Sequence, residues 1–131
     1  MRTALAVIIS MMVSLASGQE SLDTLTQEFA KKEGLDIVRK GDVKVVQYES
    51  PDVMADTLKL PKLDGKNTVV ARCDLLNGII HLGRKGEGGR EDFYYEMAKW
   101  RFWPITYKKD HDKWKEVADR FMRLCVDRDV R

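Results

Sequence analysis

The sequence predicts a single α+β domain, in which a small sheet containing a β-hairpin packs against about three helices. The length of 131 residues fits one domain. The segment TVVARCDLLNGIIHL has apolar β-formers on both sides of Asn77-Gly78, which is a strong hairpin signal. Two segments after the hairpin have apolar residues at helical spacing. We therefore expect strands and helices in separate parts of one chain.

Residues 1–18 are expected to form a signal peptide. Arg2 precedes an almost uninterrupted apolar run from Ala4 to Ala16, and Gly18 continues the small residues that suit cleavage. The run is shorter than the roughly 20 residues of a membrane-spanning helix. An uncleaved N-terminal anchor is the alternative. We expect a secreted or periplasmic protein whose single domain covers residues 19–131, with no membrane contact after cleavage.

The first helix of this domain is expected to begin after Ser21, a favourable N-cap residue, and to end at Gly34. Its apolar face contains Leu22, Leu25 and Phe29. The segment DIVRKGDVKVVQY then predicts one or two strands around a turn at residues 40–42. The next segment, SPDVMADTLKLPKLDGKN, is expected to be a loop or an edge, because it contains two prolines.

The hairpin is expected to have a two-residue type I′ turn at Asn77-Gly78. This register places Leu76 opposite Ile79, and Asp74 opposite His81. The following segment, GRKGEGGRE, is glycine-rich but lacks the lysine-serine or lysine-threonine ending of a P-loop. We expect it to be a flexible connection.

Two helices are expected to close the chain. The first has an apolar stripe and a more polar face, and Pro104 ends it. The stripe consists of Phe93, Tyr94, Met97 and Trp100, and the polar face of Asp92, Tyr95, Glu96 and Lys99. Phe102 and Trp103 fall off the stripe, so at least one of them could be exposed as a protein or glycan contact, and core packing against the hairpin is the alternative. The last helix is expected to start near Asp110 or Asp112 and to bury Trp114, Val117, Phe121 and either Leu124 or Cys125.

The two cysteines, Cys73 and Cys125, have only each other to pair with in an oxidising compartment. A disulfide would close a loop of about 50 residues and remove about 4 kcal/mol of unfolded-chain entropy. We expect this bond, and the alternative is two buried thiols. The net charge of +2 is too balanced to indicate nucleic acid or an anionic membrane as a partner.

Three motifs together resemble the minimal zincin core of SprT-like and related small metallopeptidases. They are a strand ending in IIHL, a helix containing FYYEMAKWRFW, and a further helix beginning with HDKW. The resemblance covers roughly residues 68–121. It places Tyr95 and Lys99 at the two ligand positions of an HExxH helix, Glu96 at the general base and His111 at the third ligand.

The two replaced histidines decide what the resemblance implies about chemistry. A lysine ammonium repels Zn²⁺, and a tyrosine would have to lose a proton with a pKa near 10. Without bound metal, Glu96 would have no acidified water to activate. The resemblance therefore implies a pseudo-metallopeptidase with no cofactor and no bound metal. It would bind an unknown protein or peptide partner through a surface formed by Tyr95, Glu96, Lys99, Trp103 and His111.

Other interpretations of these residues stay open. Glu96 and Lys99 could form a simple ion pair on a solvated helix face. Lys99 could instead fill the place of the lost zinc, partly buried, close to His111 and paired with Glu96 or Asp74. An active secreted hydrolase with Asp92, Glu96 and His111 as ligands is a second class of function. A small secreted interaction or inhibitor protein unrelated to zincins is a third.

Overall fold

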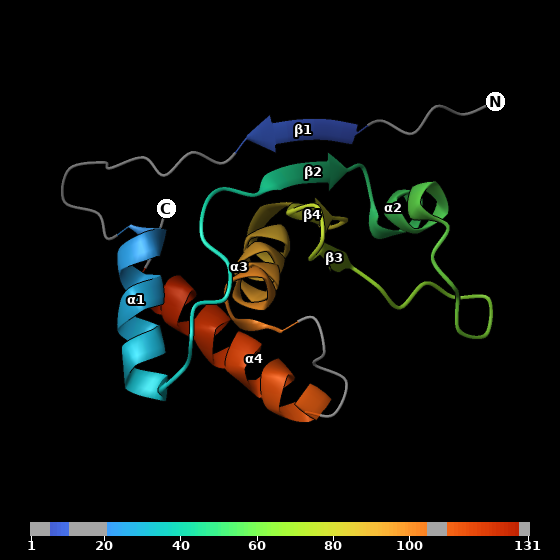
Figure 1. Ribbon diagram of the computed structural model, residues 1–131. Coiled ribbons are helices and arrows are strands. Elements are labelled where there is room, and N and C mark those ends of the chain that lie inside the picture. The colour runs from blue at the N-terminus through green and yellow to red at the C-terminus, as the bar shows by residue number, and fades with distance from the viewer. Residues whose placement is uncertain (1–5, 11–20, 105–109, 129–131) are drawn as a thin grey trace.

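The computed structural model describes residues 6–10, 21–104 and 110–128 (Figure 1). This part of the chain has an α+β fold with four helices and a four-stranded mixed sheet. The predicted fold class is confirmed, although we expected about three helices. The elements in chain order are β1 (Ala6–Ser10), α1 (Leu22–Glu33), β2 (Lys44–Tyr48), α2 (Pro51–Leu58), β3 (Ala71–Asp74), β4 (Ile79–Leu82), α3 (Gly86–Phe102) and α4 (His111–Asp127).

The strands of the sheet lie in the order β1-β2-β4-β3. β1 is antiparallel to β2, with Ala6 opposite Tyr48. β2 is parallel to β4, and β3 is antiparallel to β4. A parallel pair needs a long crossover connection, and here α2 and β3 lie in that connection. β1 lies within residues 1–18, the segment expected to be a signal peptide.

α1 has the ends that its sequence predicts. The side chain of Ser21 accepts a hydrogen bond from the backbone N–H of Thr24 at 3.1 Å. Gly34 ends the helix in the left-handed conformation, with φ of 67°, which glycine adopts without steric cost. The predicted face is buried: Leu22, Leu25 and Phe29 are at most 8 % exposed.

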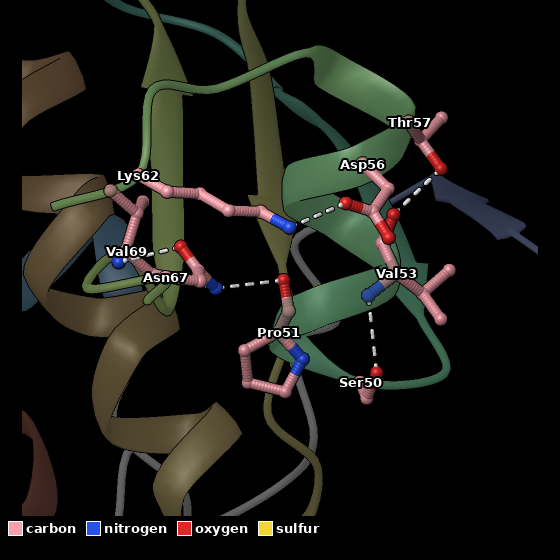
Figure 2. A network of polar contacts seen from close by, with 8 residues as sticks. All are labelled: Ser50, Pro51, Val53, Asp56, Thr57, Lys62, Asn67 and Val69. Carbon is pink, nitrogen blue, oxygen red and sulfur yellow. Dashed lines mark hydrogen bonds and ion pairs between the residues drawn. The ribbon is translucent and has the colours of Figure 1, made fainter. Parts of the chain in front are cut away.

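α2 corrects the expectation of a loop or edge at residues 50–67. Ser50 caps this helix by accepting a hydrogen bond from Val53 N–H at 3.2 Å, and Pro51 occupies the first turn (Figure 2). Proline is tolerated there because the first turn has no backbone acceptor for its missing N–H. The Asn67 amide then donates to the carbonyls of Pro51 at 3.0 Å and Val69 at 2.9 Å, which ties the following loop to the helix.

The hairpin register differs from the prediction. Residues 75–78 connect β3 and β4, so the turn has four residues. Asp74 lies opposite Ile79, and Arg72 lies opposite His81. The predicted type I′ turn and both of its cross-strand pairs, Leu76–Ile79 and Asp74–His81, are therefore wrong.

The Asp74 carboxylate explains the longer turn. Its Oδ1 accepts hydrogen bonds from the backbone N–H groups of Leu76 at 3.0 Å and Asn77 at 3.1 Å. Its Oδ2 accepts a third from the side chain of Asn77 at 2.8 Å. Aspartate commonly stabilises turns by such local bonds, and Gly78 then takes the left-handed conformation with φ of 66°.

α3 begins inside the glycine-rich segment that we expected to be a flexible connection. Residues 86–91 are helical, so that prediction is wrong for them. Gly89 is required here, because a Cβ atom would lie 2.4 Å from the carbonyl oxygen of Arg84. The helix ends at Phe102, two residues before Pro104, as predicted.

α3 lies at the centre of the molecule, with the sheet on one side and α4 on the other (Figure 1). α4 begins after Asp110 and buries Val117, Phe121 and Cys125, which confirms the prediction, while Trp114 is only half-buried. Leu124 is partly buried. Across the described residues, no helix combines the length and apolar character needed to cross a membrane.

The predicted disulfide is absent, because the sulfurs of Cys73 and Cys125 are not bonded to each other. Cys73 is in β3 and Cys125 is in α4. Each of these elements packs against α3, which lies between them (Figure 1). A disulfide needs Cα atoms within about 7 Å of each other, and the intervening helix prevents that approach.

Candidate functional site

A buried ion pair occupies the middle of α3. The Lys99 ammonium lies 3.0 Å from Oε1 and 2.9 Å from Oε2 of Glu96. The Glu96 side chain is only 2 % exposed and that of Lys99 is 22 % exposed. The interpretation as a pair on a solvated face is therefore wrong. The partial burial of Lys99 agrees with the alternative in which its ammonium fills the interior beside the carboxylate.

Burial raises the pKa of the Glu96 carboxyl above its ordinary value. The Lys99 ammonium opposes this rise through its charge and its hydrogen bond, and a backbone hydrogen bond from Cys73 lowers the pKa slightly further. The nearby carboxylate of Asp92 acts in the opposite direction and raises it. Glu96 therefore depends on the chain's own lysine to carry its charge inside the fold.

Two aromatic rings flank the Lys99 ammonium. Its nitrogen lies 5.2 Å from the ring centroid of Tyr95 and 5.0 Å from that of Trp103. Both distances are within the range of cation–π attraction. The ring of Trp103 also lies against that of His111, with centroids 6.3 Å apart in an edge-on arrangement. The structure thus gathers Tyr95, Glu96, Lys99, Trp103 and His111 into one cluster, in which Trp103 joins His111 to Lys99.

Trp103 does not provide an exposed aromatic contact. Its side chain is 3 % exposed and that of Phe102 is 1 % exposed, so both rings belong to the core and the alternative of an exposed contact is wrong. The indole N–H of Trp103 donates a hydrogen bond to the carbonyl of Trp114 at 3.1 Å. The ring therefore joins α3 to the first turns of α4.

Tyr95 is the member of the cluster that borders a surface hollow. The hollow has a volume of about 420 Å³ and lies between α3 and α4, where Lys115, Glu116, Asp119 and Arg120 complete its lining. Burial and the Glu96 charge raise the pKa of the Tyr95 hydroxyl, so it stays a neutral phenol. The four α4 residues were not predicted from the sequence. In a helix that buries Val117, residues 115, 116, 119 and 120 have the three- and four-residue spacing of neighbours on a helix surface. This spacing was the sequence signal that could have identified them.

The residues of this cluster do not fit a catalytic zinc site. A cation stands at one ligand position and a neutral phenol at the other, whereas zinc requires deprotonated or neutral nitrogen, sulfur or carboxylate donors. The alternative ligand set of Asp92, Glu96 and His111 is not assembled either. Asp92 accepts two hydrogen bonds from Arg84, at 2.8 and 2.6 Å. Within the described part of the chain, no three histidine, cysteine, aspartate or glutamate side chains are grouped suitably for a metal ion.

His81 has a different partner from the one predicted. Its Nδ1 lies 3.0 Å from the hydroxyl oxygen of Tyr48 in β2. Burial lowers the pKa of His81 although the charge of Asp74 opposes this effect. Cys73 and His81 both line a second hollow of about 470 Å³ beside the hairpin turn. Burial raises the pKa of the Cys73 thiol to about 12, which makes it a poor nucleophile.

Comparisons with known proteins identify no relative of this chain. No family model, no curated protein and no solved structure matches it. The resemblance to zincins therefore rests on the sequence motifs of this chain alone.

Proposed function

We propose that the chain is a secreted, catalytically inactive zincin-like domain that acts by binding a protein or peptide partner. One observation carries this proposal: the Lys99 ammonium lies within 3.0 Å of both Glu96 carboxylate oxygens. The position that would activate water in an HExxH enzyme is thus held by a buried ion pair. A carboxylate that is 2 % exposed and bound to lysine has no direct access to a substrate.

The hollow beside Tyr95 is the contact surface that fits this function best. It adjoins the Tyr95–Lys99–Trp103 stack, and its rim has exposed residues of both charges, Lys115 and Glu116. A groove between two helices that combines an aromatic wall with opposite charges suits a peptide segment of mixed charge. We infer that a partner segment lies along the α3–α4 junction.

Metal analysis tests the zincin-like origin. Purified protein is compared with the double variant Tyr95→His, Lys99→His by mass spectrometry of bound metals. We expect no stoichiometric zinc in the unchanged protein and about one zinc per chain in the variant, because two histidines one helical turn apart can share a metal with His111. Failure of a folded variant to bind zinc would contradict the zincin-like origin. Zinc-dependent hydrolysis by the unchanged protein would contradict inactivity.

Peptide display tests the binding surface. Random peptides selected on the unchanged protein are tested against Lys115→Glu, which reverses one charge at the hollow. We expect weaker binding to this variant. Lys66→Glu makes the same charge change in the exposed loop before β3 and serves as the matched control. Peptides that bind both variants equally well would place the contact outside the hollow.

A further inference from the structure

The turn between β3 and β4 contains Asn77 followed by Gly78, and asparagine loses ammonia most readily before glycine. In this reaction the glycine nitrogen attacks Cγ of the asparagine, and glycine leaves its nitrogen unshielded because it has no Cβ. As that bond forms, the bond from Cγ to the side-chain nitrogen breaks. The departing ammonia takes the proton that the glycine nitrogen loses, and water opens the resulting succinimide ring to aspartate or isoaspartate. Asn77 is exposed, and this chemistry is independent of the proposed function.

The nitrogen of Gly78 is held back from this reaction in the folded chain. Its N–H donates a hydrogen bond to the backbone carbonyl of Asp74 at 2.9 Å, so loss of its proton would break that bond. The carbonyl of Gly78 accepts a hydrogen bond from the backbone N–H of Lys44 at 2.9 Å. A Cβ atom on Gly78 would lie 3.2 Å from the ring of Trp100, so the glycine also packs closely against α3. These contacts fix the attacking group.

The side chain of Asn77 is held by the same aspartate. Its Nδ2 donates to Oδ2 of Asp74 at 2.8 Å, and its backbone N–H donates to Oδ1 at 3.1 Å. The hydrogen bond from the Asn77 side chain holds the pKa of Asp74 below its ordinary value. The carboxylate is therefore ionised at neutral pH, which strengthens the bond and leaves no proton to give to departing ammonia. Cγ of Asn77 turns toward the Gly78 nitrogen only by rotation of a side chain that this contact restrains.

We propose that Asn77 is a modification site of this chain, and that Asp74 is the positioning residue that keeps it unmodified while the turn is closed. Deamidation then follows local opening of the hairpin. Its product has a carboxylate in place of the amide that lay 2.8 Å from Oδ2 of Asp74. Two carboxylates cannot both stay charged at that separation without strong repulsion, so the modified turn does not close again. Modification at Asn77 therefore marks chains whose hairpin has opened.

A second site in the same molecule tests the restraint. Asp64→Asn places another Leu-Asn-Gly sequence in the exposed loop before β3. Three residues before position 64 is Pro61, which has no carboxylate to hold the new amide. The full chain is incubated at pH 8 and 37 °C, and peptide mapping by mass spectrometry follows both positions. We expect position 64 to react about tenfold faster than Asn77 in the folded chain, and both to react at similar rates in guanidinium chloride. Equal rates in the folded chain would overturn the proposal.

Asp74→Asn separates the restraint on the amide from the structure of the turn. Its Oδ1 can still accept from the backbone N–H groups of Leu76 and Asn77, but a donating amide group replaces Oδ2. We expect Asn77 to react several-fold faster in this variant, with unchanged hydrogen exchange at the Gly78 N–H. An unchanged rate, or a faster rate only together with faster exchange at Gly78, would overturn the positioning role. Asp42→Asn makes the same charge change before β2 and is the matched control.

The modified chain tests the consequence for the turn. Chains with a carboxylate at position 77 carry one more negative charge and are separated from unmodified chains by ion exchange. We expect the Gly78 N–H to exchange faster in the modified chains at pH 7, because the repulsion beside Asp74 keeps the turn open. Equal exchange in the two forms would overturn the claim that modification prevents closure.

Discussion

At the scale of single residues, the ion pair between Lys99 and Glu96 makes the clearest prediction about stability. Lys99→Met should lower the free energy of unfolding by about 3 kcal/mol at pH 7, because it leaves the buried carboxylate without its cation. Urea denaturation measures this loss. Lys115→Met removes an exposed lysine from α4 and should change the stability by less than about 1 kcal/mol. Similar values for the two variants would mean that the pair contributes little.

Glu96 also makes the stability depend on pH. Its pKa in the folded chain lies above the ordinary value of 4.5, so in this range the folded state binds more protons than the unfolded state. Its contribution is therefore fully present below pH 4.5 and is lost as the pH rises through the raised pKa. Glu96→Gln should have a flatter stability profile between pH 4.5 and 7 in urea denaturation. A profile as steep as that of the unchanged protein would assign the dependence to another group.

The sequence placed the residues of the candidate site in one cluster but misjudged their exposure. The spacing of Tyr95, Glu96 and Lys99 fixes their relation along one helix, and this relation is independent of the rest of the fold. Whether that face meets solvent depends on β3 and α4, which cover it through long-range contacts. The side chains of Glu96 and Trp103 are buried for this reason, and a periodicity argument confined to α3 could not reveal it.

At the scale of elements, the glycines at the start of α3 form a natural matched pair. Gly89→Ala should destabilise the protein by about 1–3 kcal/mol, because the new Cβ would lie 2.4 Å from a backbone oxygen of Arg84. Gly88→Ala should destabilise the protein less than Gly89→Ala, because alanine favours the helix and its Cβ would lie 3.3 Å from the Arg84 side chain, a contact that a small shift relieves. Thermal unfolding of both variants measures the difference. Equal effects would show that the close approach at Gly89 is not maintained in solution.

The helix ends were the most predictable elements, and α2 and the hairpin register were the least. Ser21 and Gly34 act through bonds within a few residues of themselves, so sequence signals are sufficient for α1. The sequence prediction missed α2 because Pro51 was expected to interrupt regular secondary structure. Proline also suits the first turn of a helix after a capping serine. The register was wrong because the Asp74 side chain stabilises a longer turn than Asn77-Gly78 alone indicates.

At the scale of the whole molecule, the central position of α3 separates the two thiols and makes the fold independent of oxidation. A reducing agent should leave the melting temperature unchanged, and intact mass after alkylation in denaturant should show two modified cysteines. A native disulfide would behave differently, because its loss usually costs 2–5 kcal/mol, equivalent to several degrees in a chain of this size. A fall of that size under reduction would show that the cysteines pair in solution.

The pairing of β1 in the sheet would compete with export of the chain. The strand that covers the edge of β2 consists of residues 6–10, which lie inside the segment expected to direct secretion. A translocation apparatus needs this segment accessible, so early pairing with residues 44–48 would hide it. After cleavage the sheet would keep only β2, β4 and β3, and β2 would become an open edge with unpaired backbone groups. The same five residues therefore cannot serve as an exported chain's leader and as the lasting border of its sheet.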